Sequence, residues 1–178
     1  MPTMIWPWKS SLPSPDRERR SARPLRKLLQ NALPQVREMA TYALVMRGGR
    51  ETAAELARVA AIDADSAVRV AAATVLGAVG RAEGMILGLI DNQLRSPALW
   101  DEEVMVALAR ALCAAGGTKS VALLGVWAAE LANPLIGHGQ WMRYRSAILK
   151  VMRRAQREIR LRMRADELNN GGGTHHEQ

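Results

Sequence analysis

The sequence predicts an all-α protein: a short right-handed α-solenoid of about three to four helical hairpins, followed by a long basic C-terminal helix. Composition is the first observation behind this prediction, since apolar residues make up 48% of the chain although Phe is absent and Tyr occurs twice. A composition rich in Ala and poor in aromatic residues is typical of closely packed helices and disfavours sheets. The second observation is a capped apolar helix that recurs with the period of one helical hairpin.

The clearest copy of this helix lies within residues 63–80. Asp65 stands where an N-cap belongs, because its carboxylate can accept hydrogen bonds from free backbone N–H groups. Gly80 stands where the chain leaves the helix, and we expect it to have a positive φ. Between them apolar side chains recur at three- and four-residue spacing and predict one buried stripe. The stripe consists of Val68, Ala72, Val75, Leu76 and Val79.

The same pattern recurs on both sides of this copy. It reads Val-Arg-x-x-Ala-x-x-x-Leu-x-x-x-Gly and begins at Val36 and, 32 residues later, at Val68. It returns 36 residues further on at Val104, with Met105 in place of the arginine and Leu108 in place of the alanine, and a degraded fourth copy begins at Tyr144. The period is that of two helices, so no single hairpin can bury its apolar face alone. Second apolar-periodic segments follow the three glycines, over residues 52–61, 82–94 and 119–131.

The segment over residues 63–80 resembles the first helix of a bacterial HEAT repeat, of the type also grouped with phycobilisome-lyase-like repeats. The resemblance extends over roughly residues 24–133. In that family the Asp, and the Arg that follows the Val, usually belong to a structural ladder that joins successive repeats. The resemblance therefore implies a structural role for the repeat positions Arg37, Gly48, Asp65, Arg69, Gly80 and Gly116.

The chain divides into four parts. Residues 1–22 are expected to be a flexible arm rich in Pro, Ser and Arg, and residues 169–178 a disordered tail. Residues 23–133 are the predicted solenoid, in which Pro34 opens the first full repeat helix. Residues 134–168 are the predicted capping region, with its long basic helix over about 140–168.

One connection within the solenoid carries a Trp-Asp pair. Asp101 is expected to cap the third repeat helix, with Trp100 packed beside it as a hydrophobic staple. An alternative is a base-excising site like that of HEAT-like DNA glycosylases, but no other residue of such a pocket can be identified.

The arm contains an unusual apolar motif, Ile5-Trp6-Pro7-Trp8. One interpretation is that these side chains fold back as a cap over the first hairpin. Two functional interpretations are a docking peptide for another protein and an interfacial contact with a membrane surface. Ile5, Trp6 and Trp8 are therefore the candidate docking arm.

The net charge of +8 is concentrated at the two ends of the chain. Residues 1–30 hold seven Lys or Arg against two acids, residues 31–134 nine against eleven, and residues 135–178 nine against four. A solenoid that bound nucleic acid along its repeats would more simply be basic along its whole length. The basic character instead points to the last helix, whose apolar stripe can cap the solenoid or pair with a second copy. The candidate contacts to phosphate or to an acidic partner are Arg143, Arg145, Arg153, Arg154, Arg157, Arg160 and Arg164.

No catalytic constellation is found, so we expect a protein that is not an enzyme and needs no cofactor or metal. Cys113 falls within an apolar pattern and is expected to be a small buried hydrophobe, and His138 stands alone. The start of the chain lacks the basic and apolar regions of a secretory signal, and no apolar run could span a bilayer. We therefore expect a cytoplasmic protein.

These observations favour a non-enzymatic scaffold or adaptor whose solenoid surface binds another protein. The first alternative is a nucleic-acid-binding protein that uses its two basic ends. The second, suggested by the lyase-like resemblance, is a chaperone-like subunit for cofactor attachment to a partner protein.

Overall fold

The computed structural model describes residues 23–79, 82–96, 100–133 and 145–171. Over these residues the protein is all-helical and contains no strand, so the predicted all-α class is confirmed. Residues 1–22, with Ile5, Trp6 and Trp8, lie outside the described residues, as do Gly80 and Arg143. After a short helix over residues 23–28, the helices are α2 (Pro34–Val45), α3 (Gly49–Ile62), α4 (Ser66–Leu76), α5 (Glu83–Arg95), α6 (Glu102–Ala115), α7 (Thr118–Ala132) and α8 (Arg145–Gly171).

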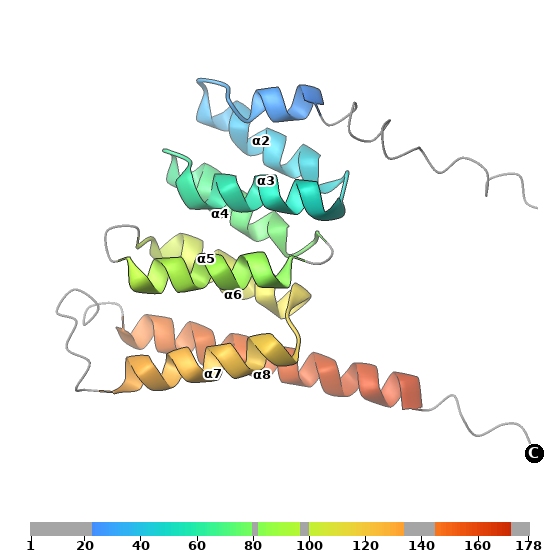
Figure 1. Ribbon diagram of the computed structural model, residues 1–178, viewed down its shortest axis with the longest axis vertical. Coiled ribbons are helices and arrows are strands. Elements are labelled where there is room, and N and C mark those ends of the chain that lie inside the picture. The colour runs from blue at the N-terminus through green and yellow to red at the C-terminus, as the bar shows by residue number, and fades with distance from the viewer. Residues whose placement is uncertain (1–22, 80–81, 97–99, 134–144, 172–178) are drawn as a thin grey trace, which may run out of the picture.

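The helices form a stack of two rows (Figure 1). In the even row, α4 packs on α2, α6 on α4 and α8 on α6. Each helix of the odd row packs against the even helix that follows it in sequence, so α3 contacts α4, α5 contacts α6 and α7 contacts α8. The buried apolar side chains of both rows join into one continuous core, which contains the predicted stripe of α4.

Asp65 begins α4 as the sequence predicts. Its carboxylate accepts a hydrogen bond from the Val68 N–H at 3.2 Å. The predicted end of this helix was wrong, because α4 ends at Leu76 and not at Gly80. Hydrogen bonds of the tighter i to i+3 type, such as that from Ala78 N–H to the Val75 carbonyl at 3.0 Å, replace the last turn.

Glycine is required at the repeat positions Gly48 and Gly116 for two different structural reasons. Gly48 leaves α2 with a φ of 63°, a conformation that side chains with a Cβ rarely adopt. Gly116 has a φ of −78° and needs no such freedom. A Cβ at Gly116 would lie 2.7 Å from the Leu112 carbonyl oxygen, so close contact requires glycine there.

The long last helix extends further than predicted. It continues to Gly171, so the expectation of a disordered tail from residue 169 was wrong for residues 169–171. Once a helix is anchored by packing, each added residue gains a backbone hydrogen bond, and weak helix formers can continue it. No helix in the described part of the chain is long and apolar enough to cross a membrane.

Candidate partner-binding surface

Two arginines of the even row tie successive repeats together. Arg37 of α2 donates two hydrogen bonds to the Asp63 carboxylate, from Nε at 2.9 Å and from Nη2 at 2.8 Å. One repeat later, Arg69 of α4 donates from Nη2 to Asp101 Oδ2 at 2.7 Å. Each arginine also donates from Nη1 to backbone carbonyls just before its own helix, Arg37 to Asn31 at 2.9 Å and Arg69 to Asp63 at 2.8 Å. The arginines therefore link α2 to the turn before α4, and α4 to the N-terminus of α6.

The acid in this ladder is not the one that the family resemblance implies. Asp65 caps α4, and Asp63, two residues earlier, receives the guanidinium of Arg37. Asp101 combines both functions, since it pairs with Arg69 and accepts hydrogen bonds from the Glu103 and Val104 N–H groups. The predicted N-cap at Asp101 is thus confirmed.

The electrostatics of both carboxylates follow from these contacts. Burial alone would raise the pKa of Asp63, but hydrogen bonds from Arg37 and the Asp65 N–H outweigh burial and hold the pKa below its usual range. Burial likewise opposes the hydrogen bonds that Asp101 receives from Ser66 and Arg69, and the net pKa is again lowered. The ladder positions therefore hold ionised carboxylates that serve the fold.

Between α6 and α8 the arginine–aspartate pair of the ladder is replaced by another kind of contact. Met105 occupies the arginine position and is buried at 2% exposure. The link to α8 is made instead by Arg162, a residue of the last helix that sequence reasoning did not single out. Its guanidinium donates to the carbonyls of Cys113, Ala114 and Gly116, at the C-terminal end of α6. A cation at this position satisfies free carbonyls and complements the helix dipole.

A second contact that sequence reasoning missed joins α5 to α7. Glu83 Oε1 accepts hydrogen bonds from Gly117 N–H at 2.8 Å and from Ser120 Oγ at 2.6 Å. Although burial would raise the pKa of Glu83, these hydrogen bonds keep it below its usual range. Glu83 caps a helix that begins 35 residues later, so no local pattern could have revealed the contact.

The buried face of α8 fixes the orientation of the whole helix. Ile148, Met152 and Ile159 are each at most 2% exposed. Gln156 Nε2 donates to the Val121 carbonyl of α7 at 2.8 Å. Together with Arg162, these contacts hold α8 against both α6 and α7.

The opposite face of α8 carries a line of exposed cations, which we call the basic stripe. Its members recur at alternating three- and four-residue spacing, so they lie along one side of the helix over about 21 Å. No ion pair is formed by any of them with the described residues. The basic stripe consists of Lys150, Arg153, Arg157, Arg160 and Arg164.

The remaining candidate arginines of the last helix separate from the stripe. Arg154 is exposed but pairs with Glu158 at 2.7 Å, and Arg145 is half-buried at the start of α8. The structure therefore brings Arg153, Arg157, Arg160 and Arg164 together with Lys150 and leaves Arg145 and Arg154 aside.

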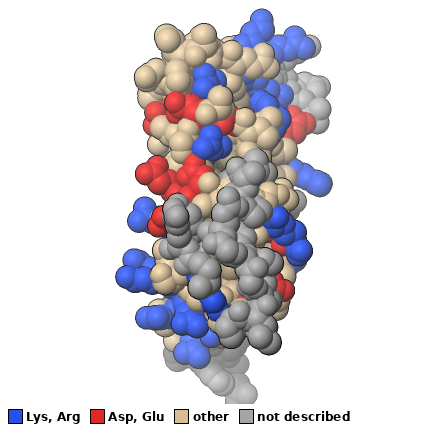
Figure 2. All heavy atoms as spheres, turned by 90° about the vertical axis from the view of Figure 1, so that its left-hand side faces the viewer, with Lys and Arg blue, Asp and Glu red and all other residues tan. Residues whose placement is uncertain are grey.

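The basic stripe does not stabilise the helix that carries it. Like charges three or four residues apart destabilise a helix by about 0.2–0.5 kcal/mol per pair. In Figure 2, Lys and Arg side chains gather at the top of the face shown and again low on it, at the level of α7 and α8, and most acidic side chains lie between the two groups. The stripe is thus an electropositive surface without a structural reason within the described chain.

The other groups in the described structure that could take part in catalysis or ligand binding are protonated or already paired. Burial, followed by the neighbouring Glu158, raises the pKa of the Cys113 thiol to about 11, so it is protonated at neutral pH. A cleft of about 550 Å³ beside α3 is lined by Arg37 and Arg58, which pair with Asp63 and Glu55. No cluster of His, Cys, Asp and Glu suited to a metal ion occurs among the described residues.

Comparisons with protein-family models, curated proteins and solved structures found nothing that matches this chain.

Proposed function

We propose that this protein is a non-enzymatic interaction module: a short α-solenoid of the HEAT type that holds an acidic segment of another protein on its last helix. The observation that carries the proposal is the basic stripe of α8, which is exposed, forms no ion pair with the described residues and is unfavourable for the isolated helix. Arg is well suited to such a surface, because its guanidinium can bind a carboxylate with two hydrogen bonds.

The support of α8 makes the stripe a preorganised surface. Arg162 fastens the helix to the end of α6, and the buried side chains on the opposite face fix its rotation. Binding would therefore require no ordering of the helix backbone, and only the side chains of the stripe would lose rotamer freedom. The ladder at Arg37 and Arg69 would serve the same end by keeping the repeats in register.

Exposed leucines beside the stripe favour a protein partner. Leu161 is 58% exposed and Leu168 is 78% exposed. Helical spacing places Leu161 next to Arg157 and Arg164, and Leu168 next to Arg164. Protein interfaces combine apolar anchors with Arg, whereas contacts to a phosphate backbone need only the cations. The matching partner is an acidic segment with apolar side chains among its carboxylates.

A second candidate partner is a nucleic-acid backbone, which is favoured by the nearly uninterrupted positive charge along the stripe. Between residues 146 and 164 the only acid is Glu158, and it is paired with Arg154. Binding of this kind would tolerate any sequence and weaken steeply with salt, with a slope of log affinity against log salt of about −4 for five phosphate contacts.

Probes of equal length distinguish the two candidates. We would measure the affinity of the full-length protein for a Glu/Leu peptide, a Glu/Ser peptide and a single-stranded oligonucleotide across a salt series. A preference for the Glu/Leu peptide, lost in Leu161→Ser/Leu168→Ser, would support the protein partner. Tighter, steeply salt-dependent binding of the oligonucleotide, unaffected by the leucine changes, would favour the second candidate.

A charge-matched pair of variants tests the site itself. Arg157→Gln/Arg160→Gln/Arg164→Gln removes three cations from the stripe and should weaken binding of the preferred probe at least about tenfold. The control Arg47→Gln/Arg50→Gln/Lys119→Gln removes the same charge from exposed positions elsewhere and should retain most of the affinity. Equal losses in the two variants would contradict a site on α8.

A further inference from the structure

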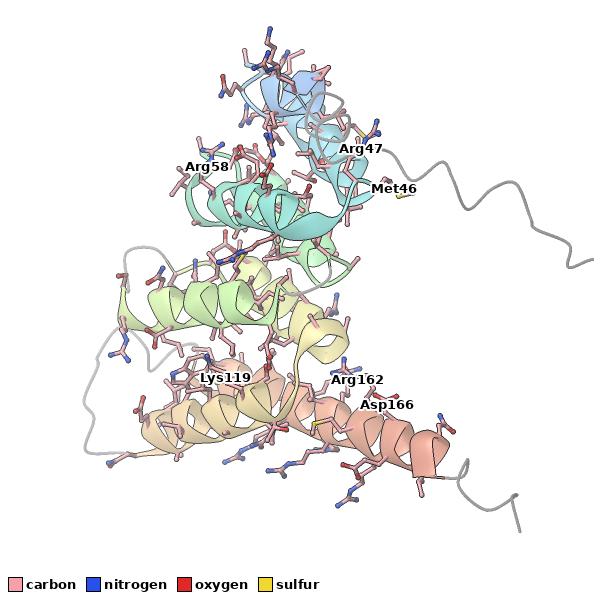
Figure 3. All side chains as sticks on the ribbon, turned by 45° about the vertical axis from the view of Figure 1, so that its right-hand side comes forward. Met46, Arg47, Arg58, Lys119, Arg162 and Asp166 are labelled. Carbon is pink, nitrogen blue, oxygen red and sulfur yellow. The ribbon has the colours of Figure 1, made fainter. Side chains whose placement is uncertain are left out.

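The first full helix carries an exposed apolar face. On α2, Met39 is 67% exposed, Tyr42 is 42% exposed and Met46 is 84% exposed. Their spacing places them on one side of the helix, opposite the buried Ala40 and Leu44. In Figure 3 Met46 lies at the edge of the stack and points away from the neighbouring helices.

Equivalent positions in the inner repeats indicate which neighbour this side of α2 would contact. Ala111 of α6 faces α4, because a Cβ added to Gly77 would lie 2.7 Å from the Ala111 Cα. The position of Ala111 in its repeat corresponds to Val75 in α4 and to Ala43 in α2. Ala43 lies on the same side of α2 as the exposed methionines, four residues after Met39 and three before Met46. The face of α2 around Ala43 is therefore the one that a preceding even-row element would cover.

The position corresponding to Met39 supports this conclusion. It is occupied by Ala71 in α4 and Ala107 in α6, which are 3% and 5% exposed, respectively. The Met39 position is thus buried in the two inner helices and open in α2, whereas the positions of Tyr42 and Met46 are exposed in all three repeats. What α2 lacks in the described structure is a neighbour on its outer side.

The connectivity of the stack indicates which segment supplies that neighbour. An even-row helix directly precedes each of α3, α5 and α7 in sequence. The short helix over residues 23–28 continues into the buried Leu29, and its Arg26 bonds Glu51 of α3 at 3.3 Å. It thus enters the stack beside the odd row, and the segment that precedes it is residues 1–22.

We propose that Ile5, Trp6 and Trp8 cover the apolar face of α2 formed by Met39, Tyr42 and Met46. They include the two tryptophans of residues 1–22 and form the apolar motif Ile5-Trp6-Pro7-Trp8. From Trp8 to Arg23 an extended chain can reach about 50 Å, which exceeds the length of α2 of about 18 Å. Indole rings also make favourable contacts with methionine sulfur.

The occupant does not need to be a helix. Pro7 stands between the two tryptophans, and a proline inside a helix removes a backbone hydrogen bond. The contact would consist of a few side chains laid across α2, which closes the end of the even row without a complete further repeat.

Methionine methyl resonances of the full-length protein test the contact. Indole rings seated on α2 should shift the Met39 and Met46 methyl signals upfield, and Trp6→Ala/Trp8→Ala should abolish that shift. The methyls of Met105 and Met152, which are 2% and 1% exposed, report whether the core stays intact. Arg19→Ala/Arg20→Ala is the matched control within the same segment and should leave all four signals in place.

Each other outcome would overturn the proposal. Met39 and Met46 signals that are the same with and without the indoles would show that the segment does not cover α2. A shift that grows with protein concentration would assign the α2 face to a second copy of the chain instead.

Discussion

The guanidinium of Arg37 binds both carboxylate oxygens of Asp63, at 2.9 and 2.8 Å, and thereby ties α2 to the turn that precedes α4. The pair is well shielded, since the side chains are 13% and 8% exposed. Arg37 also donates to the carbonyls of Asn31 and Ala32. One side chain thus satisfies polar groups from the connection that precedes α2 and from the one that precedes α4.

Breaking this pair should destabilise the protein measurably. Arg37→Met removes two hydrogen bonds and the counter-charge from the Asp63 carboxylate and the donor from two carbonyls, and we expect a loss of about 2–4 kcal/mol in the free energy of unfolding. Urea denaturation followed by circular dichroism measures the change. The control Arg58→Met removes a more exposed pair with Glu55 and should cost less than about 1 kcal/mol. Similar losses in both variants would show that the ladder adds nothing to stability.

Stability should fall in acid in a way that depends on the ladder. The folded-state pKa values of Asp63, Asp101 and Glu83 all lie below their ordinary values. Their contribution is complete above the unfolded-state values near 4 and is lost as pH falls through the folded-state values. The free energy of unfolding should therefore be flat above about pH 5 and decline below about pH 4.

Replacing the ladder acid should flatten this decline. In Asp63→Asn the group that gains protons on unfolding is absent, so the slope of unfolding free energy against pH below about pH 4 should be shallower than in the parent protein. Urea titrations at several pH values between 3 and 7 give the slope. An unchanged slope would mean that other carboxylates control acid unfolding.

Replacing Gly77 and Gly88 with alanine should change the stability of the protein in opposite directions. A Cβ at Gly77 would lie 2.7 Å from the Ala111 Cα, so Gly77→Ala must push α4 and α6 apart and should cost about 1–3 kcal/mol. Gly88 lies inside α5 with nothing within 4 Å of an added Cβ. Gly88→Ala should therefore stabilise the protein by about 0.5–1 kcal/mol, because alanine is the better helix former. Thermal unfolding of both variants provides the comparison, and a change of the same sign in the two would contradict it.

Cys113 should react slowly with alkylating reagents. Its pKa of about 11 stands against an ordinary value of 9.0, which reduces the thiolate fraction at neutral pH by about a hundredfold. Iodoacetamide labelling of the native protein at pH 7.5 should therefore be much slower than labelling of the urea-unfolded chain. Equal rates would show that the thiol is neither buried nor influenced by Glu158.

The local features of the fold were predictable from the sequence because each depends on nearby residues. Capping by Asp65 and Asp101, the turn at Gly48 and the apolar stripe of α4 all follow from spacing within a few residues. The exact repeat spacing also made Arg37 and Arg69 equivalent, as their matching hydrogen bonds show. The end of α4 was missed because the local pattern placed it at Gly80, and the pattern also does not contain the close approach of Gly77 to Ala111 of α6.

The candidate site was only partly predictable. The sequence identified a basic last helix, but it gave the same weight to Arg154 and Arg160 and did not single out Arg162. The structure separates these three, since Arg154 pairs with Glu158, Arg162 binds the end of α6, and Arg160 lies in the stripe. A linear pattern does not reveal which side of a helix is buried when cations surround much of its circumference.

By itself, the sequence determined the all-helical class, the repeat and the excess of positive charge at the chain ends. These properties arise from periodicity and composition, which act over short distances along the chain. The tertiary structure decided which acid meets Arg37, which glycine must lack a Cβ and which cations form no ion pair with the described residues. Those outcomes depend on contacts between residues some 26 to 49 positions apart, and such contacts exist only once the helices have stacked.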